Sequence, residues 1–137
     1  MPVPTLPSRR PDAIDLTGVR ALVEDFYARI HADALLGPVF ERHVPDWSAH
    51  LEQMTAFWNG LLRGEPGFSG APLARHLAID GLEWSLFERW LALFAQSADV
   101  CCPPQVAATA LERARRIAGH FWQHYQRRLA LPQHPGI

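Results

Sequence analysis

The 137-residue chain contains no lysine, and all 13 of its basic residues are arginine. Enzymes that form a Schiff base with a substrate or with pyridoxal phosphate need a lysine amine. The phosphate-binding loop of nucleotide-hydrolysing proteins needs a lysine on the phosphates, and protein kinases need one as well. The absence of lysine therefore excludes these three classes of protein.

The chain also lacks an excess of charge and a long apolar run. Its 14 acidic residues nearly balance the arginines, which gives a net charge of −1. This balance provides no electrostatic basis for binding nucleic acid or an anionic membrane. No uncharged apolar stretch approaches the ~18 residues of a membrane-spanning helix. Prolines precede Arg9 and Arg10, the wrong order for a signal peptide. We therefore expect a cytoplasmic protein.

Cysteine is scarce, and the two cysteines, Cys101 and Cys102, are adjacent. Neighbouring cysteines cannot join distant segments by a disulfide, so a disulfide-stabilised scaffold is excluded. No C-x-x-C spacing is present, which excludes a thioredoxin-type motif. We interpret the pair as two small apolar residues in a turn before Pro103.

The spacing of apolar residues is helical from residue 14 onward, and no segment alternates in the manner of a strand. Thr17 is expected to cap the first helix, and Gly37-Pro38 to break the chain before a short turn. Asp46 is expected to cap a second long helix that ends at Gly64. The sequence predicts an all-α protein.

Three further helices are expected after residue 71. Pro72 opens a short one, Asp80 caps the next, and Pro103-Pro104 opens the last. The proline-rich residues 1–13 are expected to form a disordered extension and residues 132–137 a flexible tail. One helical domain would therefore span residues 14–131.

Four side chains with polar tips lie on or beside the apolar faces of four different helices. A helix turns about 100° per residue, which places Tyr27, His50, His76 and Trp90 toward the interior. Each one alone is readily explained as a core residue with a hydrogen-bond partner. Together with the five tryptophans and seven phenylalanines, they indicate a cavity with apolar walls and a polar centre.

A second pair of histidines, His120 and His124, has the i, i+4 spacing of metal ligands. No third ligand accompanies the pair in the sequence. We interpret both histidines as residues on the flank of the last helix, where the negative end of the helix dipole favours imidazolium.

The order and spacing of several short motifs resemble the truncated haemoglobins, and group III of that family in particular. The resemblance covers roughly residues 14–125, and the matching pieces are Phe26-Tyr27, Leu36-Gly37-Pro38-Val39-Phe40, His50, Phe57-Trp58, Pro72-Leu73-Ala74-Arg75-His76-Leu77 and Phe87-Glu88-Arg89-Trp90-Leu91. It implies a shortened globin fold, with two helices packed over two around a non-covalent b-type haem.

The resemblance also implies a role for individual residues. His76 would be the iron ligand on the proximal side of the haem, and Arg75 would pair with a haem propionate, with Arg63 as a second candidate. Tyr27, His50 and Trp90 would line the opposite, ligand-binding side. The apolar walls of the haem pocket would be Phe40, Met54, Phe57, Trp58, Leu73 and Phe87.

Three functions remain open at this point. The favoured one is a globin that reversibly binds dioxygen or another diatomic ligand at a histidine-ligated iron. The second is a haem enzyme of the peroxidase or nitric-oxide dioxygenase type, which would need a separate reductase as its partner. The third is a haem-free helical interaction domain whose inward histidines belong to the core.

Overall fold

A computed structural model describes residues 13–64 and 82–130 of the chain. These residues form five α-helices and no strand: α1 (Leu16–Ala32), α2 (Leu36–His43), α3 (Trp47–Arg63), α5 (Trp84–Cys101) and α6 (Pro104–Ala130). The predicted all-α class is therefore confirmed. The predicted extension up to residue 12, the short helix from Pro72 and the tail lie outside the described residues.

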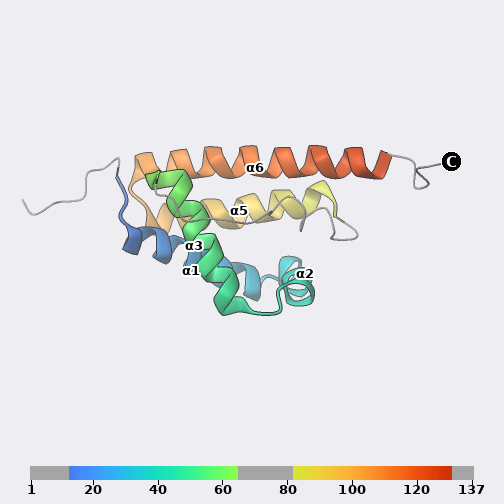
Figure 1. Ribbon diagram of the computed structural model, residues 1–137, viewed down its shortest axis with the longest axis horizontal. Helices are drawn as coiled ribbons and strands as arrows, with labels where there is room; N and C mark the ends of the chain where they lie inside the picture. Colours follow the sequence, from blue (N-terminus) through green and yellow to red (C-terminus); the bar gives the residue numbers. More distant parts are fainter. Residues whose placement is uncertain (1–12, 65–81, 131–137) are drawn as a thin grey trace, which may run out of the picture.

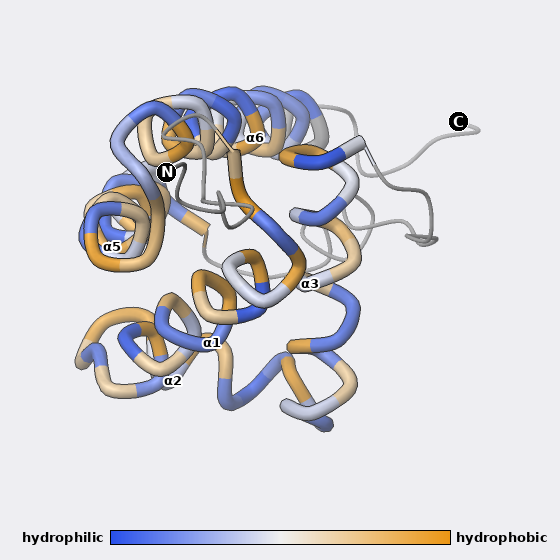
Figure 2. Tube along the Cα trace, turned by 90° about the vertical axis from the view of Figure 1, so that its left-hand side faces the viewer, coloured by the Kyte–Doolittle hydropathy of each residue, from blue (hydrophilic) through white to orange (hydrophobic). Residues whose placement is uncertain are grey.

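α1, α5 and α6 run roughly along one direction, and α3 runs across them (Figure 1). α5 and α6 make an antiparallel hairpin with the most extensive contact in the fold, and α1 packs on α5 (Figure 1). α3 packs across α1. α2 follows α1 in the chain and packs against the C-terminal part of α1. Viewed from the side, apolar residues face the space between the helices and the outer side of α6 is polar (Figure 2). Among the described helices, none is long and apolar enough to cross a membrane.

Local capping residues define both ends of α3. The Asp46 carboxylate accepts a hydrogen bond from the Ala49 backbone N–H at 3.1 Å. Gly64 ends the helix in the left-handed conformation, with φ 70°. Both features match the prediction. The cap of α1 differs, because Asp15 and not Thr17 accepts from the Gly18 N–H, at 2.8 Å.

Two predicted boundaries are wrong. Gly37-Pro38 does not break the chain but forms part of the first turn of α2. Proline is tolerated there because the first N–H groups of a helix have no partner within the helix. The helix that carries Phe87 begins at Trp84, so the cap expected at Asp80 is wrong. Its N-cap residue is Glu83, whose side chain makes no capping hydrogen bond.

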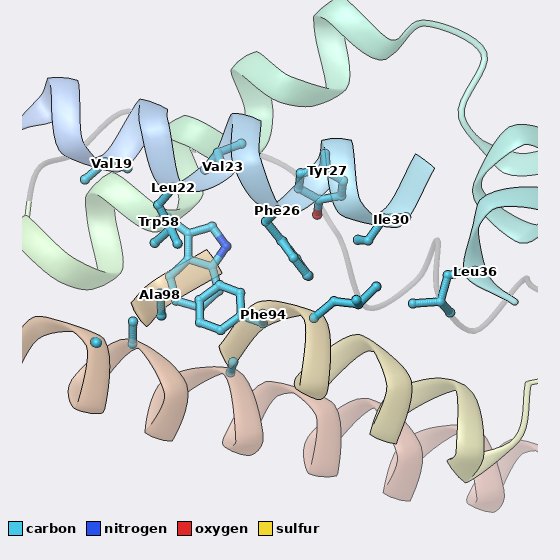
Figure 3. Close-up of a cluster of buried hydrophobic side chains, with 14 residues drawn as sticks. Val19, Leu22, Val23, Phe26, Tyr27, Ile30, Leu36, Trp58, Phe94 and Ala98 are labelled. Atoms are coloured by element: carbon cyan, nitrogen blue, oxygen red, sulfur yellow. The ribbon is translucent and has the colours of Figure 1, made fainter. Parts of the chain in front are cut away.

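The core is built mainly from one face of α1. Its fully buried residues recur at helical spacing and meet Trp58 of α3 and Phe94 of α5 (Figure 3). Alanines at positions 107, 110 and 114 of α6 belong to the same core. Because alanine is small, α6 can approach α5 closely along its length.

Asp33 joins α1, α2 and α5 at one point. Its carboxylate accepts hydrogen bonds from the Leu35 and Leu36 backbone N–H groups, which fixes the start of α2. The Arg89 side chain of α5 donates to the same carboxylate at 2.7 Å. The hydrogen bond from Arg89 is the main cause that lowers the pKa of Asp33. This junction fixes the helices that carry Tyr27, Phe40 and Trp90.

Candidate functional site

Tyr27 is the centre of the candidate site. Its side chain is 5% exposed, and its ring meets His50 of α3 edge-on, with ring centroids 4.9 Å apart and an interplanar angle of 89°. Phe40 of α2 lies 5.9 Å away, and Trp47 of α3 lies 6.1 Å away. The structure thus brings together three of the residues predicted for the site, from three different helices.

Trp90, the third predicted polar residue, joins this group through Phe26. The Phe26 ring lies 5.0 Å from Tyr27 and 5.3 Å from Trp90, in both cases at a steep angle. Trp90 in turn stacks on Phe94 at 5.9 Å. Trp90 is only partly buried, so its indole lies at the edge of the core.

The predicted wall residues fall into two places. Met54 and Phe57 are partly buried against the core, whereas Trp58 is 2% exposed and stacks on Phe94 at 4.8 Å. Phe87 is also buried, but it stacks on Trp84 at 5.8 Å. It therefore belongs to a second aromatic cluster, where the start of α5 meets α6.

The other residues predicted to bind haem or a metal make no contact with Tyr27 or His50 in the part of the chain that the structure describes. Leu73, Arg75 and His76 lie in the segment 65–81, outside the described residues. Arg63 is the last residue of α3, and its guanidinium donates to Asn59 within the same helix at 2.9 Å. His120 and His124 have ring centroids 4.4 Å apart on α6, but the described residues contain no group of three or more metal-binding side chains.

The polar atoms of Tyr27, His50 and Trp47 are largely shielded from solvent. Burial raises the pKa of Tyr27 well above its usual range, because a phenolate would be poorly solvated there. The Nε2 atom of His50 and the Nε1 atom of Trp47 are both shielded from solvent. The arrangement offers hydrogen-bond donors inside an apolar aromatic enclosure, which suits a small ligand that carries a partial negative charge.

Trp47 is a site residue that the sequence analysis did not identify. It lies on the apolar face of α3, and its ring packs against the core. Its indole, however, contacts both Tyr27 and His50, at 6.1 and 5.9 Å. The signal was present in the sequence, because residues i and i+3 of a helix share a face and Trp47 precedes His50 by three.

Comparisons with known proteins agree with this geometry. The model of the bacterial-like globin family matches residues 12–122 of the chain. The group 3 truncated hemoglobin of Campylobacter jejuni is 32% identical over 114 residues, which cover 80% of this chain and 90% of that protein. A crystal structure of the group III truncated hemoglobin from Campylobacter jejuni matches with a TM-score of 0.78, covering 82% of this chain and 92% of that one. The chain therefore belongs to the bacterial-like globin family, in its group III truncated haemoglobin branch.

Proposed function

We propose that this chain is a globin that holds a b-type haem and reversibly binds dioxygen or another diatomic ligand. The observation that carries the proposal is the contact of the Tyr27 phenol with the His50 imidazole inside an aromatic enclosure, at 4.9 Å between ring centroids. Membership of the globin family supports the same function.

The described residues fit a haem pocket in two respects. A porphyrin needs apolar walls, and Phe40 and Met54 of α2 and α3 are partly buried apolar residues beside the site. A diatomic ligand needs a donor, and the buried Tyr27 hydroxyl can supply one because burial raises its pKa and keeps it protonated.

His76 is the proposed axial ligand, on the strength of its position in the family motif. When bound, a haem iron held by one neutral imidazole offers its sixth position to a diatomic ligand. Arg75 is the proposed partner of a haem propionate. The proposed walls of the pocket are Phe40, Met54, Phe57, Trp58, Leu73 and Phe87.

Tyr27, His50 and Trp90 are the proposed partners of the diatomic ligand. The Tyr27 hydroxyl stays protonated at neutral pH because burial raises its pKa, so it can donate. The Trp90 indole can only donate, and the His50 imidazole keeps at least one N–H in every protonation state. Three donors around one small ligand are expected to slow its release.

The absorption spectrum tests the proposal. Protein expressed with a supply of haem should show a Soret band, and His76→Ala should abolish stable haem binding. His43→Ala provides the matched control, because His43 is an exposed residue at the end of α2. If His76→Ala keeps the spectrum of a histidine-ligated haem, the assignment of the axial ligand is wrong.

A further inference from the structure

We propose that Trp47 is a positioning residue that holds the His50 imidazole inside the pocket and thereby governs both entry and retention of the diatomic ligand. The inference rests on the proposed function, since it concerns the ligand that the haem would bind. It extends that function to a residue on the outer side of the pocket, at the first position of α3.

The rings of Trp47, His50 and Tyr27 contact one another. Trp47 meets His50 edge-on, with ring centroids 5.9 Å apart and an interplanar angle of 89°. His50 meets Tyr27 with the same angle at 4.9 Å, and Tyr27 lies 6.1 Å from Trp47. The three rings thus form a closed triangle. A movement of His50 away from Tyr27 would break two perpendicular contacts, each of a geometry that aromatic pairs prefer.

Trp47 is itself held by contacts with two other helices. It stacks on Phe40 of α2 at 6.2 Å, with an interplanar angle of 21°. It also meets His31 of α1 edge-on at 5.5 Å. The His31 Nδ1 atom lies 3.4 Å from a Glu41 carboxylate oxygen. The indole therefore rests on α1 and α2 while it contacts a residue of α3.

The indole N–H of Trp47 does not hold the ring in place. Trp47 Nε1 is buried and has no hydrogen-bond acceptor in the part of the chain that the structure describes. Ring contacts rather than a hydrogen bond therefore hold the indole. A phenylalanine at this position would preserve part of these contacts, whereas an alanine would remove all of them.

The expected effect follows from the strength of one aromatic contact. An edge-to-face pair changes an equilibrium constant by about 2- to 12-fold. Trp47→Ala should therefore change the equilibrium between His50 inside and outside the pocket by a factor in this range, in favour of the outward position. Carbon monoxide should rebind faster by a similar factor after photolysis, because the path to the iron is clearer. Oxygen should dissociate faster, because one donor is lost.

A double-mutant cycle on the haem-loaded protein tests the proposal. The four proteins are the wild type, Trp47→Ala, His50→Ala and the double variant, and each is assayed for carbon monoxide rebinding and for the stretching frequency of the bound carbon monoxide. If Trp47 acts through His50, Trp47→Ala changes both quantities in the wild type and neither in the His50→Ala background. Trp47→Phe should lie between the wild type and Trp47→Ala.

Phe121→Ala is the control for removal of a large aromatic ring, because Phe121 lies on α6, where its ring contacts His120 at 6.2 Å. It should leave the stretching frequency unchanged. Equal effects of Trp47→Ala in both backgrounds, or no effect in either, would overturn the proposal. The Soret band of the same samples reports haem binding separately, so its absence would refute the proposed function and not the role of Trp47.

Discussion

Tyr27→Phe removes one hydroxyl from the candidate site and leaves the ring in place. The ring contacts with His50, Phe40 and Trp47 all lie between 4.9 and 6.1 Å, and phenylalanine can keep each of them. The variant should therefore fold and bind haem. What it loses is a neutral donor to a ligand that carries partial negative charge.

The size of the loss can be estimated from the burial of the hydroxyl. Tyr27 is 5% exposed, so water competes little for its hydrogen bond. A bond intermediate between a neutral and a charge-assisted one contributes about 1.5–2 kcal/mol. Since every 1.4 kcal/mol corresponds to a tenfold change, Tyr27→Phe should release oxygen about 10- to 30-fold faster.

Stopped-flow displacement of oxygen by carbon monoxide measures this rate. The other tyrosine provides the control, because the Tyr125 hydroxyl lies at the start of α5 and accepts from the Leu82 N–H. Tyr125→Phe should leave the oxygen release rate unchanged. An unchanged rate in Tyr27→Phe would refute the reasoning and remove Tyr27 from the set of donors.

The same burial predicts a pH dependence. Because burial raises the pKa of Tyr27 above the ordinary value of about 10, its hydroxyl stays protonated in the folded protein at pH 10. Tyr27 itself should therefore add no pH dependence to the oxygen release rate up to about pH 10. The unfolded chain, however, releases this proton above about pH 10, so the free energy of unfolding should decrease as the pH rises beyond it. Tyr27→Phe should lose this part of the alkaline decrease.

Three further predictions concern stability and are measured by thermal or denaturant unfolding. Gly37→Ala should lower the free energy of unfolding by about 1–3 kcal/mol, because the added Cβ would lie 2.8 Å from the His31 carbonyl oxygen; an unchanged midpoint contradicts this. Asp33→Asn should lower it by about 1–2 kcal/mol. Since the pKa of Asp33 is lowered in the fold, the advantage of the wild type should persist above about pH 4 and disappear as the pH falls below it. A difference that is independent of pH would refute this. Tyr125→Phe should cost about 0.5–1.5 kcal/mol by leaving the Leu82 N–H without its acceptor, and no loss would show that this bond is dispensable.

Local signals in the sequence predicted much of the fold. Asp46 and Gly64 delimit α3 through a side-chain cap and a left-handed glycine, and both act within a few residues of the chain. The start of α2 was not predicted although its cause is local, because the Asp33 carboxylate accepts from the Leu35 and Leu36 N–H groups two and three residues later. The close approach of Gly37 to a carbonyl of α1, by contrast, depends on how the two helices meet.

In the candidate site, too, some features could be predicted from the local sequence and others depend on contacts between helices. Helical faces predicted that Tyr27 and His50 would point inward, and the structure confirms that their rings meet. The role of Trp47 was not predicted, because a tryptophan on the apolar face of a helix is ordinarily a core residue. Its contact with His50 depends on where α1 and α2 place His31 and Phe40, which is a tertiary property.

The central claim is that Tyr27 and His50 belong to a haem pocket with an open ligand position. The most direct test is the absorption spectrum of the purified, haem-supplied protein in its ferric and ferrous forms, each recorded with and without an added ligand. Cyanide is the ligand for the ferric form and carbon monoxide for the ferrous form. If this pocket exists, the protein should bind one haem per chain and show a Soret band. The whole band should shift when cyanide is added to the ferric form or carbon monoxide to the ferrous form. A protein that takes up no haem, or a haem whose spectrum neither ligand alters, would contradict the claim.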